Sequence, residues 1–159
     1  MKIDLEKLTY RQSTVALIID NNKDILIVQK NSYQPNEWDF PGGGIDENEE
    51  AEQTILRELK EELGSDKFEI LKRDKDLDKY NWPENYILWR YKKYGELHRG
   101  QERVRFLVKF LGEKSEIKIE KEEIRKYQWV KIKDLKKYLI FPNYIGKIGK
   151  ILTDLGIEK

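Results

Sequence analysis

The chain has 159 residues, of which 38% are hydrophobic and 38% charged, and this suits a single domain over residues 1–159 with a core of its own. Its net charge of +1 gives no sign by itself of a polyanion partner. The absence of cysteine and the single histidine, His98, exclude a disulfide framework, a thiolate site and a histidine-rich metal site.

The N-terminal part of the chain predicts a β-hairpin followed by a glycine-rich turn. The β-branched run 14–19 and the apolar run 25–29 predict two strands. Residues 21–23 predict the tight turn between them, because Asn tolerates left-handed backbone. A short strand over 38–40 stops at Pro41, and three glycines follow.

A helix is predicted over residues 49–63. Its apolar residues recur every fourth position, which gives one buried stripe. They are Ala51, Ile55, Leu59 and Leu63. Asn48 is the expected N-cap, and Gly64 falls where a C-cap glycine belongs.

The rest of the chain predicts further strands and two helices. The predicted strands cover 68–72, 86–91, 104–111 and 124–130, with a charged connection over 74–79. The predicted helices cover 135–139 and the apolar positions from 145 to 155. Tyr86, Trp89 and Tyr91 either pack in the sheet or line a base pocket. Because strands and helices alternate, the fold class is α/β or α+β.

No apolar run approaches the roughly 20 residues that span a bilayer, and the N-terminus lacks the apolar core of a secretory signal. We therefore expect a cytoplasmic protein with no membrane association. No obligate protein partner is evident.

Three carboxylates gather at the end of the predicted 49–63 helix. Glu58, Glu61 and Glu62 all lie off its apolar stripe, so we expect them to face away from the core. Carboxylates this close repel one another unless a cation lies between them, and Mg²⁺ prefers oxygen ligands. The alternative is an ordinary solvated surface helix.

The spacing around this helix resembles a family signature. Gly43, Glu49, Arg57-Glu58-Leu59, Glu61-Glu62 and Gly64 meet every fixed Gly, Glu and Arg position of the Nudix hydrolase pattern GX5EX7REUXEEXGU, where U is bulky and aliphatic. Ser65 stands where an aliphatic residue is expected. The resemblance implies an α/β/α sandwich with a central mixed sheet, and hydrolysis of a nucleoside diphosphate linked to another group.

The same resemblance implies roles for individual residues. It implies Mg²⁺ or Mn²⁺ held by Glu58, Glu61 and Glu62 with help from Gly43, one of the glutamates acting as base. Arg57 would pair with Glu49 and fix the orientation of the helix. We therefore include Arg57 among the expected catalytic residues. Gly43 and Gly44 would let the backbone turn tightly and approach the metal or the substrate.

The flanking segments resemble one branch of the family. Residues 37–45 are similar to the W-x-F-P-Q-G-G-I entry of bacterial RNA pyrophosphohydrolases and plant-type dinucleoside tetraphosphate hydrolases, with Gly42 replacing Gln. Residues 100–107 and 123–130 resemble two later blocks of that branch. By this likeness Glu123, or its neighbour Glu122, is a further metal ligand or base.

Three more residues are candidate substrate contacts by the same resemblance. Arg11 would touch substrate phosphates, as an alternative to being a plain surface cation. Lys30 is either a phosphate contact or a surface lysine. Phe141 would stack on a base or pack under the last helix.

The leading functional hypothesis is metal-dependent pyrophosphohydrolysis of the 5′-triphosphate end of RNA, of dinucleoside polyphosphates, or of both. In the first case the products are a monophosphate end and pyrophosphate. Diadenosine tetraphosphate would instead give ATP and AMP. Two alternatives are a house-cleaning hydrolase of free nucleotides and a silent nucleotide- or RNA-binding module on the same fold.

Overall fold

Five strands form one mixed sheet in this computed structural model, which describes residues 2–157. The sheet order is β3-β4-β1-β2-β5. The strands are β1 (Tyr10–Ile19), β2 (Asp24–Lys30), β3 (Phe68–Asn81), β4 (Gly100–Phe110) and β5 (Ile124–Lys131). The helices are α1 (Ala51–Leu63), α2 (Glu84–Tyr94), α3 (Leu135–Tyr138) and α4 (Ile148–Asp154). Strands β1 and β4 are parallel, and the other neighbouring pairs are antiparallel.

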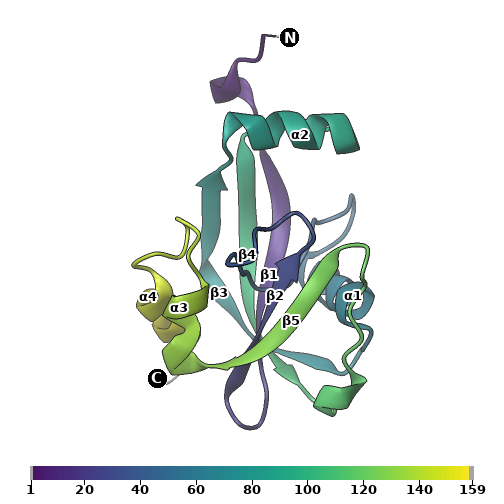
Figure 1. The fold of residues 1–159 in the computed structure, drawn as a ribbon, viewed down its shortest axis with the longest axis vertical. Helices are drawn as coiled ribbons and strands as arrows, with labels where there is room; N and C mark the ends of the chain where they lie inside the picture. Colours follow the sequence, from purple (N-terminus) through teal and green to yellow (C-terminus); the bar gives the residue numbers. More distant parts are fainter. Residues whose placement is uncertain (1, 158–159) are drawn as a thin grey trace.

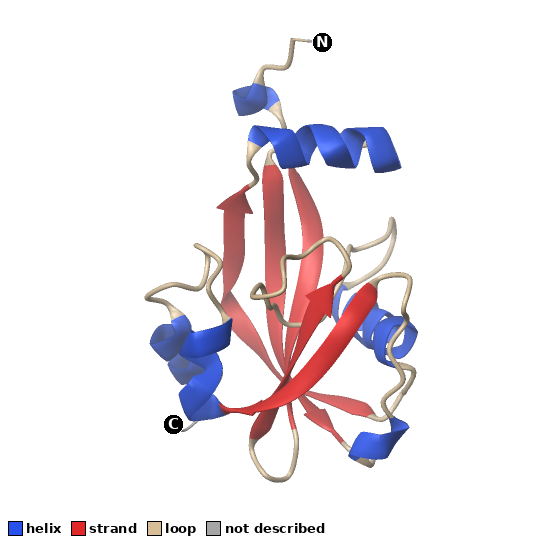
Figure 2. Cartoon of the chain, in the orientation of Figure 1, coloured by secondary structure: helices blue, strands red, loops and turns tan. Residues whose placement is uncertain are grey.

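Helices cover both faces of this sheet, which confirms the predicted α/β/α arrangement (Figures 1 and 2). The apolar stripe of α1 packs on one face, against buried residues such as Ile18 and Phe106. Helices α3 and α4 pack on the other face, against residues such as Leu17 and Ile27. Helix α2 lies across the end of the sheet (Figure 1). No helix in residues 2–157 is long and apolar enough to cross a membrane.

The glycine-rich segment is inserted where β1 and β2 separate. These strands pair directly only next to their turn, at Ile18–Leu26 and Ile19–Ile25. Beyond that point Thr14 N–H donates to the Gly43 carbonyl at 2.8 Å. A Cβ on Gly42 would lie 2.1 Å from the Thr14 carbonyl oxygen. Only glycine allows this approach, and it brings the segment beside α1.

Most predicted elements are confirmed, with two local corrections. The positive φ in the first turn belongs to Lys23 (62°) and not to an Asn. Helix α1 begins at Ala51 with Glu50 as N-cap, and its capping box with Gln53 takes the place expected for Asn48. Asn48 instead has a φ of 65°, in the loop before the helix. Gly64 is the predicted left-handed C-cap.

Two predicted segments are wrong. Residues 86–91 belong to α2, and the charged connection 74–79 belongs to β3. Aromatic and apolar residues over 86–91 imitate a buried strand, yet Ile87 is the buried residue of α2. Strand β3 is an edge strand, and its inward residues Asp74 and Asp78 are carboxylates. The hydrophobic pattern therefore predicts the wrong element for 86–91 and gives no strand signal for 74–79.

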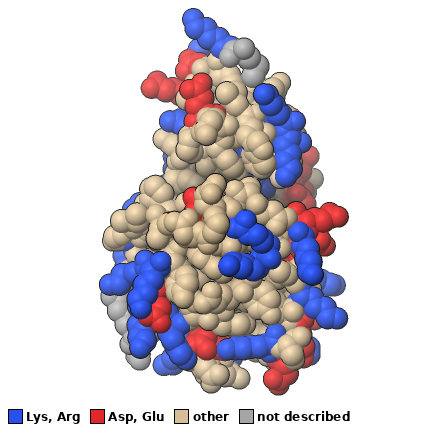
Figure 3. Space-filling view, viewed as in Figure 1, with Lys and Arg blue, Asp and Glu red and all other residues tan. Residues whose placement is uncertain are grey.

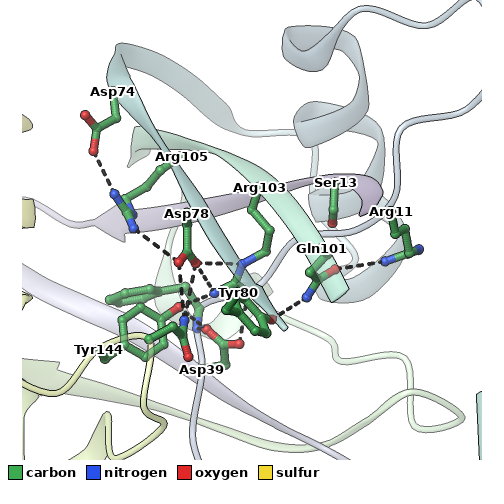
Figure 4. Close-up of polar contacts among 12 residues, drawn as sticks. Arg11, Ser13, Asp39, Asp74, Asp78, Tyr80, Gln101, Arg103, Arg105 and Tyr144 are labelled. Carbon is green, nitrogen blue, oxygen red and sulfur yellow. Dashed lines mark hydrogen bonds and ion pairs between the residues drawn. The ribbon is translucent and has the colours of Figure 1, made fainter. Parts of the chain in front are cut away.

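The inward carboxylates of β3 neutralise two arginines of β4 (Figure 4). Arg103 donates to Asp78 at 2.6 Å and to Asp39 at 2.9 Å, and its side chain is 5% exposed. Arg105 donates to Asp74 at 2.8 Å. Each charge of this network therefore has a partner of opposite sign, as burial requires.

Replacing Arg103 with Met is expected to destabilise the protein by about 3–5 kcal/mol, because Asp39 and Asp78 stay buried without that cation. Urea unfolding at pH 7 measures the loss. Arg73→Met is the control, because Arg73 is 49% exposed and pairs with Glu52 at the surface. It should cost less than about 1 kcal/mol, and equal losses in the two variants would contradict the prediction.

Candidate functional site

Arg57 lies at the centre of the carboxylate cluster on α1. Its Nε donates to Glu49 Oε2 at 2.7 Å and its Nη2 to Glu49 Oε1 at 2.9 Å, a bidentate contact. Its Nη1 donates to Glu58 at 3.0 Å and to Glu61 at 3.3 Å, and Nη2 reaches the Gly44 carbonyl at 3.1 Å. Hydrogen bonds from Arg57 lower the pKa of Glu49 to about 2. One guanidinium thus joins the glycine-rich segment to α1.

Glu62 faces inward, contrary to the prediction that all three glutamates face away from the core. Its residue is 2% exposed, and its Oε2 has no hydrogen-bond partner in residues 2–157. Burial raises the pKa of Glu62 to about 8; the charge of Lys30 opposes the rise, and those of Glu58 and Glu123 add to it. A buried carboxylate oxygen without a partner is an open position for a cation.

Glu58 and Glu61 differ in exposure. The Glu58 side chain is 13% exposed and that of Glu61 is 58% exposed. Burial raises the pKa of Glu58. The charges of Glu61 and Glu123 add to this rise, and the charge of Arg57 opposes it. A Cβ on Gly43 would lie 2.2 Å from the Glu58 carboxyl carbon. Glycine at this position therefore makes room for the Glu58 carboxylate.

Glu123 lies near this cluster, just before β5. The charge of Glu123 raises the pKa values of both Glu58 and Glu62. The backbone carbonyl of Glu123 accepts a hydrogen bond from Asn31 N–H at 2.9 Å, which fixes the turn. The Glu123 carboxylate therefore lies near those of α1.

The carbonyl of Gly43 does not support the predicted role as a metal ligand. It accepts hydrogen bonds from the Thr14 N–H at 2.8 Å and from the Ser13 and Thr14 hydroxyls at 3.0 Å. These donors occupy its lone pairs. Gly43 also contributes space for Glu58.

A second acidic group is already neutralised by cations. Carboxylate oxygens of Asp74, Asp76 and Asp154 lie within 4.8 Å of one another, the only such group in residues 2–157. Lys150 lies 2.7 Å from Asp76 and 2.5 Å from Asp154, and Arg105 pairs with Asp74. This group is therefore an ion-pair network. The glutamates of α1 are less tightly gathered, because Arg57 holds Glu58 and Glu61.

A cleft of about 470 Å³ brings together the predicted substrate residues Arg11, Lys30 and Phe141. Asp39, Tyr80 and Arg103, which also line it, belong to the buried ion-pair network or adjoin it. Lys30 is close enough to Glu62 for its charge to lower the pKa of that carboxyl. Glu58, Glu61, Glu62 and Glu123 do not line the cleft, but its lining residues Lys30 and Gly42 adjoin Glu62.

Arg11 lies over Gly44 at the side of this cleft. A Cβ on Gly44 would come 2.4 Å from Arg11 Nη2, so Gly44 acts by admitting that guanidinium. Arg11 Nη1 donates to the neutral amide oxygen of Gln101 at 3.4 Å, and Gln101 donates in turn to the Tyr80 hydroxyl (Figure 4). Arg11 therefore has a fixed direction and no close carboxylate partner.

Phe141 lies in the loop before α4. Its ring packs edge-on against Tyr33, with centroids 5.2 Å apart, and it contacts the apolar core under α4. It also lines the cleft. Both roles predicted for Phe141 fit its position: one side of the ring packs against the core, and another lines the cleft, where a base could stack.

Helix α2 and the segment before it contribute cleft residues of which the sequence interpretation named only Tyr86, as a possible part of a base pocket. Trp82, Tyr86 and Arg90 line the cleft from α2 and the segment before it. Helix signals were present in the sequence: Pro83 precedes the first turn, and Gly95 is a left-handed C-cap. The aromatic residues over 86–91 nevertheless favoured a strand prediction.

Comparisons with known proteins agree with this arrangement. Residues 9–147 match the family model described as the NUDIX domain. An RNA pyrophosphohydrolase from Sphingopyxis alaskensis is 32% identical over 142 residues, which cover 87% of this chain and 88% of that protein. One from Nitratiruptor sp. is 34% identical over 141 residues, covering 86% and 88%.

Solved structures show the same fold. The structure of the E. coli dihydroneopterin triphosphate pyrophosphohydrolase aligns with a TM-score of 0.67 at 18% identity, covering 91% of this chain and 98% of that one. A C. elegans Ap4A hydrolase aligns with a TM-score of 0.64 at 17% identity, with the same coverage. At these identities the likeness concerns the fold alone.

Glu62→Gln is expected to stabilise the metal-free protein at pH 8. The folded pKa of Glu62, about 8, lies above its unfolded value, so the folded state binds more protons and the wild type loses stability as pH rises from about 4.5 to 8. Gln avoids that loss. With chelator at pH 8 we expect a melting temperature at least about 3 °C higher, the shift that about 1 kcal/mol makes.

The same pair of proteins at pH 5 provides the control. There Glu62 is protonated and neutral, so the two melting temperatures should nearly coincide. A Gln variant that melts below the wild type at pH 8 would show that the carboxylate is not penalised by burial.

Proposed function

Because the family model and the relatives cover most of its length, the chain belongs to the Nudix family, and we propose that it is a metal-dependent pyrophosphohydrolase of the 5′-triphosphate end of RNA. The observation that supports this most directly is the buried carboxylate of Glu62, whose Oε2 has no hydrogen-bond partner in residues 2–157 and which lies near Glu58, Glu123 and the cleft residue Lys30. We treat residues 1–159 as one catalytic domain. Since RNA and nucleotides are substrates found in the cytoplasm, we propose that compartment.

The residues present fit a divalent cation. Nudix hydrolases generally use a divalent metal, and the donors gathered here are carboxylate oxygens, which Mg²⁺ and Mn²⁺ prefer. We propose that Glu58, Glu62 and Glu123 hold the cation, with Glu61 joining when Arg57 releases it. When bound, the metal supplies neutralisation of phosphate charge and a more acidic water.

The chain's own residues orient the substrate and receive the proton. Arg11 and Lys30 would bind phosphate oxygens at the carboxylate end of the cleft, and Phe141 would stack on a base at its other side. Water attacks a phosphorus of the triphosphate, the anhydride bond breaks, and pyrophosphate leaves a 5′-monophosphate end. One of the carboxylates takes the proton of that water.

RNA is the favoured substrate because the sequence relatives that match nearly the whole chain are named RNA pyrophosphohydrolases. A second candidate is a dinucleoside polyphosphate such as diadenosine tetraphosphate, split into ATP and AMP. It is supported by the flanking sequence blocks and by the fold shared with an Ap4A hydrolase. A silent binding module is disfavoured because every glutamate of the signature is retained.

Glu58→Gln and Glu62→Gln are each expected to lower kcat by at least about 10²-fold, because each removes a charge from the proposed cation site. Pyrophosphate release from a 5′-triphosphorylated RNA with Mg²⁺ measures this. Glu52→Gln is the matched control: Glu52 is on the same helix but pairs with Arg73 at the surface. Unchanged kcat in both site variants would refute the proposed ligands.

We expect a parallel assay to distinguish the two candidate substrates by their rates of hydrolysis. At equal low enzyme concentration, triphosphorylated RNA should be consumed at least about tenfold faster than diadenosine tetraphosphate, as kcat/KM. Product analysis should give pyrophosphate and a monophosphate end. Faster release of ATP and AMP from diadenosine tetraphosphate would make the dinucleotide, and not RNA, the preferred substrate.

A further inference from the structure

Arg90 of α2 lies in the cleft and has no part in the site described above. Its guanidinium carbon lies 4.8 Å from the centroid of the Trp82 ring and 4.7 Å from that of Tyr94. Contacts of this kind hold a guanidinium in place while its N–H groups stay available. Arg90 is therefore an ordered cation at the α2 side of the cleft.

Arg90 has one long ion pair among residues 2–157, with Glu96. The nearest carboxylate contact is Glu96 Oε2, at 3.9 Å from Nη2, beyond hydrogen-bond distance. The Arg90 side chain is 11% exposed, and its Nε is buried without a hydrogen-bond partner. A mostly buried cation with a free donor is stabilised when an anion supplies the missing acceptor.

Arg11 provides a second cation next to it. Both arginines line the same cleft, and the pKa of Arg11 is lowered by burial and then by the positive charge of Arg90. The hydrogen bond of Arg11 goes to the neutral Gln101. Two neighbouring guanidinium groups that line one cleft, with Glu96 as the carboxylate near both, form a site for a multiply charged anion.

We propose that Arg90 and Arg11 together bind a phosphate group of the substrate other than the one at the metal. This rests on the proposed function, which supplies a substrate with several phosphates. The charge of Glu58 also acts on Arg11, so Arg11 lies near the carboxylates of α1 as well as near Arg90. Helix α2 is then a substrate-binding element of this protein.

The phosphate that Arg90 and Arg11 would bind can come from either candidate substrate. In RNA it is a terminal phosphate of the triphosphate or the phosphodiester after the first nucleoside. In a dinucleoside polyphosphate it is a phosphate of the far nucleotide. Either presents paired oxygens to a guanidinium edge.

Binding of inorganic pyrophosphate in the presence of chelator tests the site without the metal. By titration calorimetry, Arg90→Gln should bind about tenfold to a hundredfold more weakly than the wild type, and Arg90→Lys should fall between them. Figure 3 shows basic side chains on the upper part of the molecule, where Figure 1 places α2. Lys92→Gln therefore controls for general charge: Lys92 is exposed on the same helix and outside the cleft lining, so binding should stay within about twofold.

Unchanged pyrophosphate affinity in Arg90→Gln, or an equal loss in Lys92→Gln, would overturn the proposal. Should Arg90→Gln fail to fold, Arg90→Lys decides: several-fold weaker binding at an unchanged melting temperature supports the site, and full affinity overturns it. If the wild type hydrolyses no nucleotide or RNA, the proposed function fails, while this titration still decides the anion site.

Kinetics with Mg²⁺ identify the phosphate that Arg90 binds. We would compare KM of wild type and Arg90→Gln on ATP, a 5′-triphosphorylated dinucleotide and diadenosine tetraphosphate. A rise of about tenfold on all three assigns Arg90 to the phosphate chain. A rise confined to the dinucleotide assigns it to the phosphodiester, and one confined to the tetraphosphate assigns it to the far nucleotide. No rise on any of them contradicts a substrate role.

Discussion

The site depends on the contact between Arg57 and Glu49. This bidentate pair joins the loop after the glycines to α1, and the same guanidinium also holds Glu58. Without it, carboxylates this close on one helix would repel one another and the loop would have no fixed position. None of the ion pairs of Arg57 goes to Glu62, whose buried Oε2 has no hydrogen-bond partner in residues 2–157. The protein therefore neutralises its outer carboxylates internally and leaves the inner one buried with an unsatisfied oxygen, at a cost in stability.

The separation of β1 and β2 determines where this cluster lies. Because the two strands pair only beside their turn, residues 41–45 occupy the space between them and bring Gly43 against Glu58. At the same end of the sheet, Arg103 and its aspartates form a charged but fully paired floor for the cleft. A rigid, polar floor suits a charged substrate, because its dipoles need no rearrangement when the substrate binds.

The sequence predicted the parts of the fold that short-range patterns specify. The stripe from Ala51 to Leu63 and the C-cap Gly64 lie within one helix, so α1 could be recognised from local spacing. The part of strand β3 beyond the predicted 68–72 could not, because Asp74 and Asp78 are buried only through pairing with arginines 25 or more residues away. The inward position of Glu62 was missed for a related reason. Its burial comes from the segments around Gly42 and Glu120 that close over it, and helical periodicity carries no information about them.

Chemistry and substrate choice therefore have different origins in this chain. The signature from Gly43 to Gly64 specifies an anhydride-cleaving centre by spacing alone. The groups that would select a substrate come from separate elements: Arg11 from β1, Phe141 from the loop before α4, and Arg90 from α2. Helix α2 closes one end of the cleft with aromatic rings and a guanidinium whose ion pair with Glu96 is long, so its length and composition can change which phosphate chain fits while the carboxylate centre stays the same. An RNA 5′ end and a dinucleotide share the reacting anhydride, and they differ where the substrate would meet α2.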